Sequence, residues 1–227
     1  MLVAGLVALV AAGAYGITFS WLFAADEVRV EGTERISEEE IRRLGGLAEG
    51  DNVFHLDTVA VEARMERDPR IADAVVEADL PDLIVVRVVE RIPVAVAEVA
   101  GSPRTVADDG AVLPGTPPQG LPRIEAVGGE LGEARRVAAA RALAAMTPAL
   151  RRSIATVYTD TDDELVIETG GGVTVTYGAV LDVASKADAL RAVLSWAEEE
   201  GIDLIAVDVT VPSAPTARTA DGTFTPR

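Results

Sequence analysis

The chain has 227 residues, of which 49% are hydrophobic, and its formal net charge is −17. That length fits one large or two small domains, and the acidity argues against nucleic-acid binding, which depends on Lys and Arg against phosphates. The chain has no cysteine, which excludes disulfide frameworks, thiolate zinc sites and cysteine nucleophiles together.

The first 25 residues carry no charged side chain, and Asp26 is the first charge. About 23 helical residues span roughly 35 Å, enough to cross a hydrocarbon layer of about 30 Å. A cleaved signal peptide is the alternative, but it prefers a basic start and a shorter apolar run. We therefore expect a single transmembrane helix over residues 1–25, with Trp21 at the membrane interface. The N-terminus is expected inside and the bulk outside the cytoplasmic membrane.

Residues 26–93 are predicted to form a strand, two helices and two more strands. Residues 28–31 alternate between apolar and polar, which indicates a half-buried strand. Ser37 and Glu40 form a capping-box pattern that begins a helix through Leu44, and Asp57 can cap a second helix. Val-rich strands are then expected at 71–78 and 83–90, joined by a hairpin loop at 80–82.

Residues 94–218 are predicted to form a second domain, a mixed antiparallel β-domain with two helices. Glycine, proline and aspartate clusters separate its segments. The expected strands are 94–99, 111–113, 153–159, 164–169, 173–177 and 205–211, and the expected helices are 133–146 and 183–199. The polar tail 219–227 is expected to be disordered. The fold class is therefore α+β.

The first of these domains resembles the FtsQ-type POTRA domain, and the whole chain resembles the FtsQ/DivIB family of bacterial cell-division proteins. In this family a membrane helix leads into four short motifs in a fixed order. The matching residues are Val28, Val30 and Gly32; Gly50, Asn52, Val53, Phe54, Leu56 and Asp57; Pro69, Ile71, Ala74 and Val76; and Leu80, Pro81, Ile84, Val86, Val88, Glu90, Arg91, Pro93, Val94 and Ala95.

The resemblance continues through the second domain, to about residue 218. The matching residues are Gly110, Val112, Leu113, Leu121, Pro122, Gly172, Val175, Gly178, Lys186 and residues 207–212. Ala107 departs from the family, which has an aspartate there. The resemblance implies a scaffold at the division septum that binds FtsB-like and FtsL-like coiled-coil proteins outside the membrane. It also implies help in regulating septal peptidoglycan synthesis by the FtsW/FtsI synthase complex, with no cofactor and no small-molecule substrate.

A partner-binding surface is expected on the final strand, 205–211. An exposed sheet edge offers unpaired N–H and C=O groups to a partner strand, and Pro212 would end such pairing. The candidate residues are Lys186, Ile205, Val207, Val209, Thr210, Val211, Pro212 and Ser213. Lys186 is either a solvated lysine or a cation that meets an acidic partner group. Familiar family members carry an arginine at position 210 and an aromatic residue at 211, both absent here.

Catalysis is not expected, since no set of titratable residues converges in the sequence. His55 is the only histidine, and its place between Phe54 and Leu56 indicates a turn or strand edge. Asp160, Asp162 and Asp163 lack the glycine and terminal glutamate of a calcium loop. The three glycines at 170–172 precede a strand, whereas a phosphate loop leads into a helix.

Two other functions remain open. One is a POTRA-containing factor for envelope secretion or assembly. The other is an exported enzyme, which the lack of a convergent site disfavours.

Overall fold

The computed structural model describes residues 2–160 and 164–224. The chain divides into two compact units, Met1–Arg91 and Ile92–Arg227. Its buried apolar side chains form two clusters that share no member, one within each unit. Each unit therefore has a hydrophobic core of its own.

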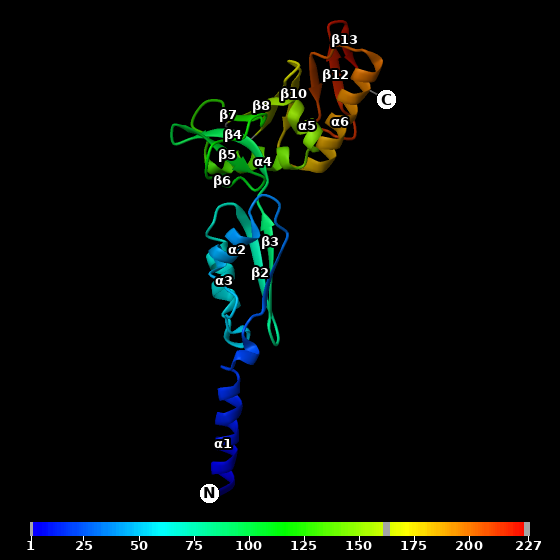
Figure 1. The fold of residues 1–227 in the computed structure, drawn as a ribbon. Coiled ribbons are helices and arrows are strands. Elements are labelled where there is room, and N and C mark those ends of the chain that lie inside the picture. The colour runs from blue at the N-terminus through cyan, green and yellow to red at the C-terminus, as the bar shows by residue number, and fades with distance from the viewer. Residues whose placement is uncertain (1, 161–163, 225–227) are drawn as a thin grey trace. The chain divides into compact units, whose positions relative to one another are not determined.

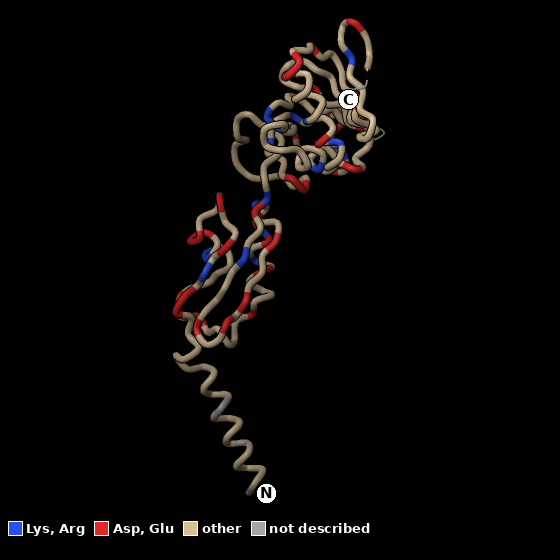
Figure 2. Tube along the Cα trace, turned by 90° about the vertical axis from the view of Figure 1, so that its right-hand side faces the viewer, with Lys and Arg blue, Asp and Glu red and all other residues tan. Residues whose placement is uncertain are grey.

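The first unit begins with helix α1 (Leu2–Ile17), followed by a short 3₁₀ helix, η1 (Trp21–Phe23). Figure 2 shows no acidic or basic residue along α1, and its described side chains are exposed. Within the described part of the chain, no helix combines the length and the apolar character that crossing a membrane requires. The anchor expected over residues 1–25 thus stays a prediction.

A three-stranded sheet with two helices packed against it forms the rest of the first unit (Figure 1). The strand order is β1-β3-β2, with β3 parallel to β1 and antiparallel to β2. This confirms the predicted strand–helix–helix–strand–strand order. The elements are β1 (Glu27–Glu31), α2 (Glu38–Gly45), η2 (Val53–His55), α3 (Thr58–Met65), β2 (Ile71–Asp79) and β3 (Leu83–Glu90).

The helix starts of this unit follow the predicted caps. The Ser37 hydroxyl accepts a hydrogen bond from Glu40 N–H at 3.3 Å, and the Asp57 carboxylate accepts one from Ala60 N–H at 3.0 Å. The Glu40 carboxylate accepts a hydrogen bond from Arg70 Nη2 at 2.7 Å. Glu40 thereby ties the first turn of α2 to the segment before β2.

Glu90 and Gly32 show why two of the motif residues are needed. The Glu90 carboxylate accepts hydrogen bonds from the backbone N–H groups of residues 34, 35 and 36, at 2.9 to 3.1 Å. Gly32 has a φ of 85°, and a Cβ atom there would collide with the carbonyl oxygen of Val88. The loop after β1 therefore needs both an acceptor and a glycine to close against β3.

The second unit is built on a ten-stranded mixed sheet, in the order β13-β12-β11-β10-β9-β8-β7-β4-β5-β6. Helices α4 (Glu133–Ala144), α5 (Pro148–Ser153) and α6 (Val183–Glu200) connect its strands. The predicted meander is confirmed, because β8, β9 and β10 pair antiparallel in sequence. The strands are β4 (Pro93–Val99), β5 (Ser102–Ala107), β6 (Val112–Leu113), β7 (Arg123–Ala126), β8 (Ile154–Thr159), β9 (Leu165–Thr169), β10 (Thr174–Gly178), β11 (Ala206–Asp208), β12 (Thr216–Thr219) and β13 (Gly222–Phe224).

The end of the chain differs from its prediction in two ways. The strand expected over 205–211 is only three residues long, and it lies inside the sheet between β10 and β12. The tail expected to be disordered, 219–227, contains the last residue of β12 and the whole of β13, which pair as an antiparallel hairpin up to residue 224. Residues 225–227 lie outside the described residues. The sheet edge at this end is therefore β13, and the prediction that residues 205–211 form it is wrong.

Candidate partner-binding surface

The eight residues predicted to contact a partner fall into a buried and an exposed group. Lys186, Val207 and Val209 are buried, with exposed fractions of 4%, 2% and 0%. Each of them packs within the second unit rather than presenting its side chain to solvent. The exposed or half-exposed residues are Ile205, Thr210, Val211, Pro212 and Ser213.

Lys186 holds the connection between β10 and α6. Its Nζ donates hydrogen bonds to the carbonyl oxygens of Tyr177 at 2.9 Å and Ala179 at 2.8 Å. The same Nζ lies 5.3 Å from the centre of the Tyr177 ring, a cation–π distance. The lysine is thus neither a solvated cation nor one aimed at a partner. It binds this unit's own backbone.

Tyr177 is the buried neighbour of this lysine. Its hydroxyl donates a hydrogen bond to the carbonyl oxygen of Val183 at 3.0 Å. Burial raises the pKa of the Tyr177 phenol well above its usual range, because the interior disfavours a phenolate. The next residue, Gly178, has a φ of 70°, and a Cβ atom there would press against the Thr210 side chain. The connection between β10 and α6 is therefore packed against Lys186 of α6 and against Thr210.

Val209 contributes a hydrogen bond as well as core packing. Its N–H donates to the carbonyl oxygen of Thr176 at 3.0 Å, just past the β10–β11 ladder. Asp208 Oδ1 accepts from both the N–H and the hydroxyl of Thr210, at 2.8 and 2.6 Å, which turns the chain outward. The following connection exposes Val211, whose exposed fraction is 56%.

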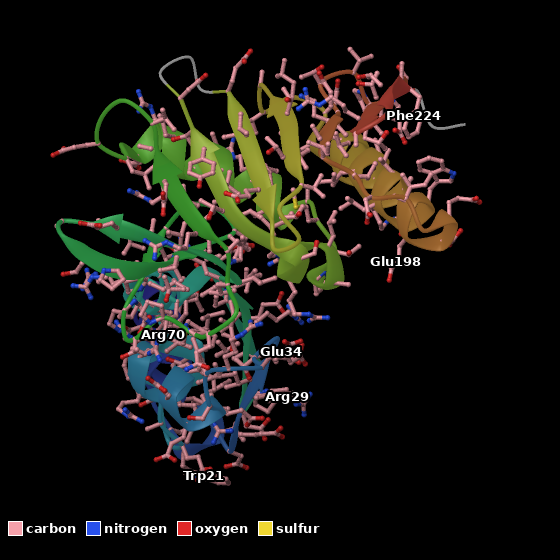
Figure 3. The ribbon with its side chains drawn as sticks, turned by 90° about the horizontal axis from the view of Figure 1, so that it is seen from above. Trp21, Arg29, Glu34, Arg70, Glu198 and Phe224 are labelled. Carbon is pink, nitrogen blue, oxygen red and sulfur yellow. The ribbon has the colours of Figure 1, made fainter. Side chains whose placement is uncertain are left out.

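The β12–β13 hairpin forms the free edge of the sheet at this end. Its turn is Ala220-Asp221, and Thr219 pairs with Gly222. Phe224 packs against Trp196 of α6 with ring centres 5.4 Å apart, which fixes β13 to the helix (Figure 3). The pairing places Phe224 opposite Ala217, near the end of the hairpin where the 209–215 connection enters. The open edge and the exposed Val211 thus belong to the same part of the unit.

The sequence contained a signal for this hairpin that the prediction did not use. Asp221-Gly222 is a turn-forming pair, and the turn lies one residue earlier, at Ala220-Asp221, with Gly222 already in β13. The polar composition of residues 219–227 instead led to the prediction of a disordered tail. Ala217 is the only buried residue among the described residues of β12 and β13, so the two strands show little apolar periodicity.

The described residues show no grouping of titratable side chains that could hold a metal ion. His55 lies in η2. Its Nε2 is 2.8 Å from the hydroxyl of Thr18. Asp160 Oδ1 accepts a hydrogen bond from Glu164 N–H at 2.9 Å, while Asp162 and Asp163 lie outside the described residues. The turn at 170–172 joins β9 to β10, as predicted for a hairpin.

Comparison with known proteins gives consistent matches. Residues 23–91 match the family model of the POTRA domain, FtsQ-type. A cell division protein FtsQ from Streptomyces collinus is 30% identical over 231 residues, covering 95% of this chain and 86% of the relative. FtsQ from Streptomyces bingchenggensis is also 30% identical, over 86% of this chain and 76% of the relative. FtsQ from Mycobacteroides abscessus is 27% identical over 96% of this chain and 69% of the relative. The chain belongs to the FtsQ family of cell-division proteins.

Proposed function

We propose that this chain is a non-catalytic, single-pass scaffold of the divisome that binds FtsB-like and FtsL-like partners on the extracytoplasmic side. Through them it helps to regulate septal peptidoglycan synthesis by the FtsW/FtsI synthase complex. The observation that carries the proposal is the free edge of β13, the outermost strand of a ten-stranded sheet. A partner strand can extend such an edge through backbone hydrogen bonds alone.

The N-terminal segment supports membrane attachment. Apolar side chains cover α1 on all sides, and those of Val3, Leu9 and Val10 are 64% to 77% exposed. An apolar helix with no protein around it is stable in a lipid environment and costly to expose to water. We propose that residues 1–25 together form the anchor.

The hairpin pairing predicts which backbone groups of β13 face a partner. Facing residues of antiparallel strands alternate between hydrogen-bonded and non-bonded pairs. Arg218 faces Thr223 across the hairpin, but its carbonyl oxygen accepts a hydrogen bond from Ile205 N–H on the other side, at 2.8 Å. Arg218 and Thr223 therefore form a non-bonded pair. The N–H and C=O groups of Thr223 therefore point away from β12, toward an added strand.

Two substitutions at one position test the proposal. Thr223→Pro removes the outward N–H while the bonded pairs of the β12–β13 hairpin are kept. Thr223→Ala keeps that N–H and serves as the matched control. Co-purification of the FtsB-like partner with the full chain is expected to be lost with proline and retained with alanine. In a Trp21→Phe background, which leaves Trp196 as the only tryptophan, unchanged fluorescence would show that the hairpin still packs on α6. A folded Thr223→Pro variant that binds at the wild-type level would contradict strand addition at β13.

Val209→Pro, the substitution that follows from the predicted strand addition at residues 205–211, is a poorer test. Val209 is fully buried and its N–H is already bonded to Thr176. Proline there would disrupt the sheet itself, and lost binding would then report unfolding.

Imaging tests the place of action. An N-terminal fluorescent fusion is expected to form a midcell band that fades when the FtsB-like partner is depleted. An even peripheral signal throughout the cell cycle, with normal division after deletion, would exclude the divisome role.

A further inference from the structure

Aromatic rings from two separate segments gather at the end of α1. Phe19 stacks on His55 with ring centres 4.0 Å apart, and Tyr15 packs edge-on to both of them, at 5.2 Å from Phe19 and 6.1 Å from His55. His55 contacts Phe54 at 5.3 Å, and Phe54 contacts Phe23 at 5.4 Å. These five linked rings, from Tyr15, Phe19, Phe23, Phe54 and His55, are called the aromatic collar here.

Hydrogen bonds hold the two halves of the collar together. The Thr18 hydroxyl lies 2.8 Å from His55 Nε2, and the Thr18 carbonyl accepts from Asn52 Nδ2 at 2.8 Å. Ala25 N–H donates to the Asp51 carbonyl at 2.8 Å, and Gly50 N–H donates back to Ala25 at 2.9 Å. The loop that carries Phe54 and His55 is thus fixed against the segment that leaves α1.

The collar is exposed although it is apolar. Tyr15 is 63% exposed, Phe19 58% and Phe54 48%, and Trp21 in the same segment is 85% exposed. The collar is continuous with α1, and no charged residue interrupts residues 1–25. Large exposed aromatic surfaces of this kind mark an interaction site.

The β2–β3 turn lies at the same end of the first unit (Figure 1). Asp82 O accepts a hydrogen bond from Asp26 N–H at 2.8 Å, and Leu80 in this turn is 50% exposed. Apolar side chains from three segments therefore project at the end of the unit from which α1 departs. Glu34 lies beyond the opposite end of the sheet, because β1 and β3 run parallel away from this turn.

We infer that the aromatic collar seats the POTRA-type unit in the headgroup layer of the bilayer. Phe54 and His55 would then contact lipid together with the end of the anchor. This inference rests on the proposed membrane attachment of residues 1–25. Aromatic rings favour this layer because it solvates an apolar body and a polar edge together. The surface fits zwitterionic lipid, since the first basic residue in the sequence is Arg29. The charged residues beside the collar include the acidic Asp26, Glu27, Asp51 and Asp82.

Contact of the collar with lipid would restrict the first unit more than attachment by the anchor helix alone. A helix joined to a domain by a free linker would leave that domain mobile above the membrane. The bonds from Thr18 and Ala25 instead fix the 50–55 loop to the end of the anchor. The first unit would then stand at a defined height, with its β2–β3 turn facing the lipid.

Site-directed spin labelling of the full chain in phosphatidylcholine nanodiscs tests the seat. The chain has no cysteine, so each introduced cysteine is the only labelled site. A nitroxide at Glu49→Cys, on the exposed loop beside the collar, reports the loop. A nitroxide at Glu34→Cys reports the far end of the same unit. Collision with a water-soluble relaxing agent is expected to be several-fold lower at 49 than at 34.

The substitution Phe54→Ala should raise the collision rate at 49 toward the value at 34. Val89→Ala, which truncates another exposed apolar side chain of the first unit (55% exposed), should leave the rate unchanged. Equal rates at 49 and 34 in the parent chain would overturn the inference. Protection at 49 that survives Phe54→Ala would overturn the role given to Phe54.

A separate probe distinguishes failure of the seat from failure of the anchor. The chain has two tryptophans, Trp21 and Trp196, so Trp196→Phe leaves Trp21 as the only one. Brominated lipid should quench Trp21 if the anchor is inserted. Quenching of Trp21 without protection at 49 rejects the seat alone. No quenching of Trp21 rejects the membrane attachment and the seat with it.

Discussion

A single buried lysine shows how a residue expected at a surface can instead stabilise the fold. The Lys186 ammonium group donates hydrogen bonds to two backbone carbonyls, and none of its described contacts is with a carboxylate. A buried cation without a counter-charge is costly, and two carbonyl acceptors and an aromatic face offset part of that cost. Its role in this chain is to fix the β10–α6 corner, close to the connection that exposes Val211.

Lys186→Met should therefore destabilise the second unit. It leaves the Tyr177 and Ala179 carbonyls without their donor, and a buried polar group left unpaired costs about 1–3 kcal/mol. Arg191→Met on the same helix is the control, since its ion pair with Asp188 is exposed and such pairs contribute at most about 1 kcal/mol. Urea unfolding followed by Trp196 fluorescence, in a Trp21→Phe background, measures both. Equal losses for the two variants would refute the structural role of Lys186.

A second prediction at this scale concerns acid stability of the first unit. Arg70 donates hydrogen bonds to both carboxylate oxygens of Asp68, from Nε at 2.9 Å and from Nη2 at 2.7 Å. These bonds lower the pKa of Asp68, while burial opposes them. A lowered folded-state pKa gives stability that is present above the unfolded value, about 3.9. That stability is lost as the pH falls from there through the folded-state pKa.

Asp68→Asn should accordingly flatten the acid limb of the first unit's stability curve below about pH 4. Asp73→Asn, which removes an exposed carboxylate on β2, is the matched control. Unfolding midpoints measured across the acid range decide the matter. An unaltered slope in the Asp68→Asn variant would mean that the Arg70 pair does not contribute to acid stability.

At the scale of elements, local chemistry explains which predictions hold. Caps and turns are encoded by a few residues, so α2 and α3 began where Ser37 and Asp57 indicated. Strands β2 and β3 were also predictable, because valine-containing apolar segments of eight or nine residues between turn residues favour strands. The short strand β7 was not predicted, although the two-residue β6 was. β7 has four residues, and it pairs with β4 and β8, which are distant from it in sequence.

The sheet edge was predicted at the wrong strand because its position, like that of β7, depends on pairing between segments distant in sequence. An edge strand is defined by its lack of a neighbour, which is a property of the whole sheet and not of the strand's own residues. Residues 205–211 alternate well enough to indicate a strand, but they carry no mark that β12 would pair with them. The strand that occupies the edge, β13, has three residues and one large apolar side chain, Phe224. Sequence reasoning could propose strand addition as the mode of contact, but only the pairing shows which strand is the free edge.

At the scale of the whole molecule, the two cores predict separate unfolding. The cluster around Ile41 and Met65 lies wholly within the first unit, and the cluster around Leu143 and Ile167 wholly within the second. Cooperative unfolding follows a shared hydrophobic core, and the two clusters have no residue in common. Each unit is therefore expected to have its own unfolding transition.

Two matched substitutions test this independence. Ile84 in β3 and Ile167 in β9 are both fully buried, and each lies in a strand with neighbours on both sides. Removing one methylene from such a site costs about 0.5–1.5 kcal/mol. Ile84→Val should weaken hydrogen-exchange protection in the sheet of the first unit alone, and Ile167→Val in the sheet of the second unit alone. If either change lowered protection in both sheets by the same free energy, the units would unfold as one. In that case a partner bound at β13 could also stabilise the POTRA-type unit, whereas independent unfolding confines that stabilisation to the second unit.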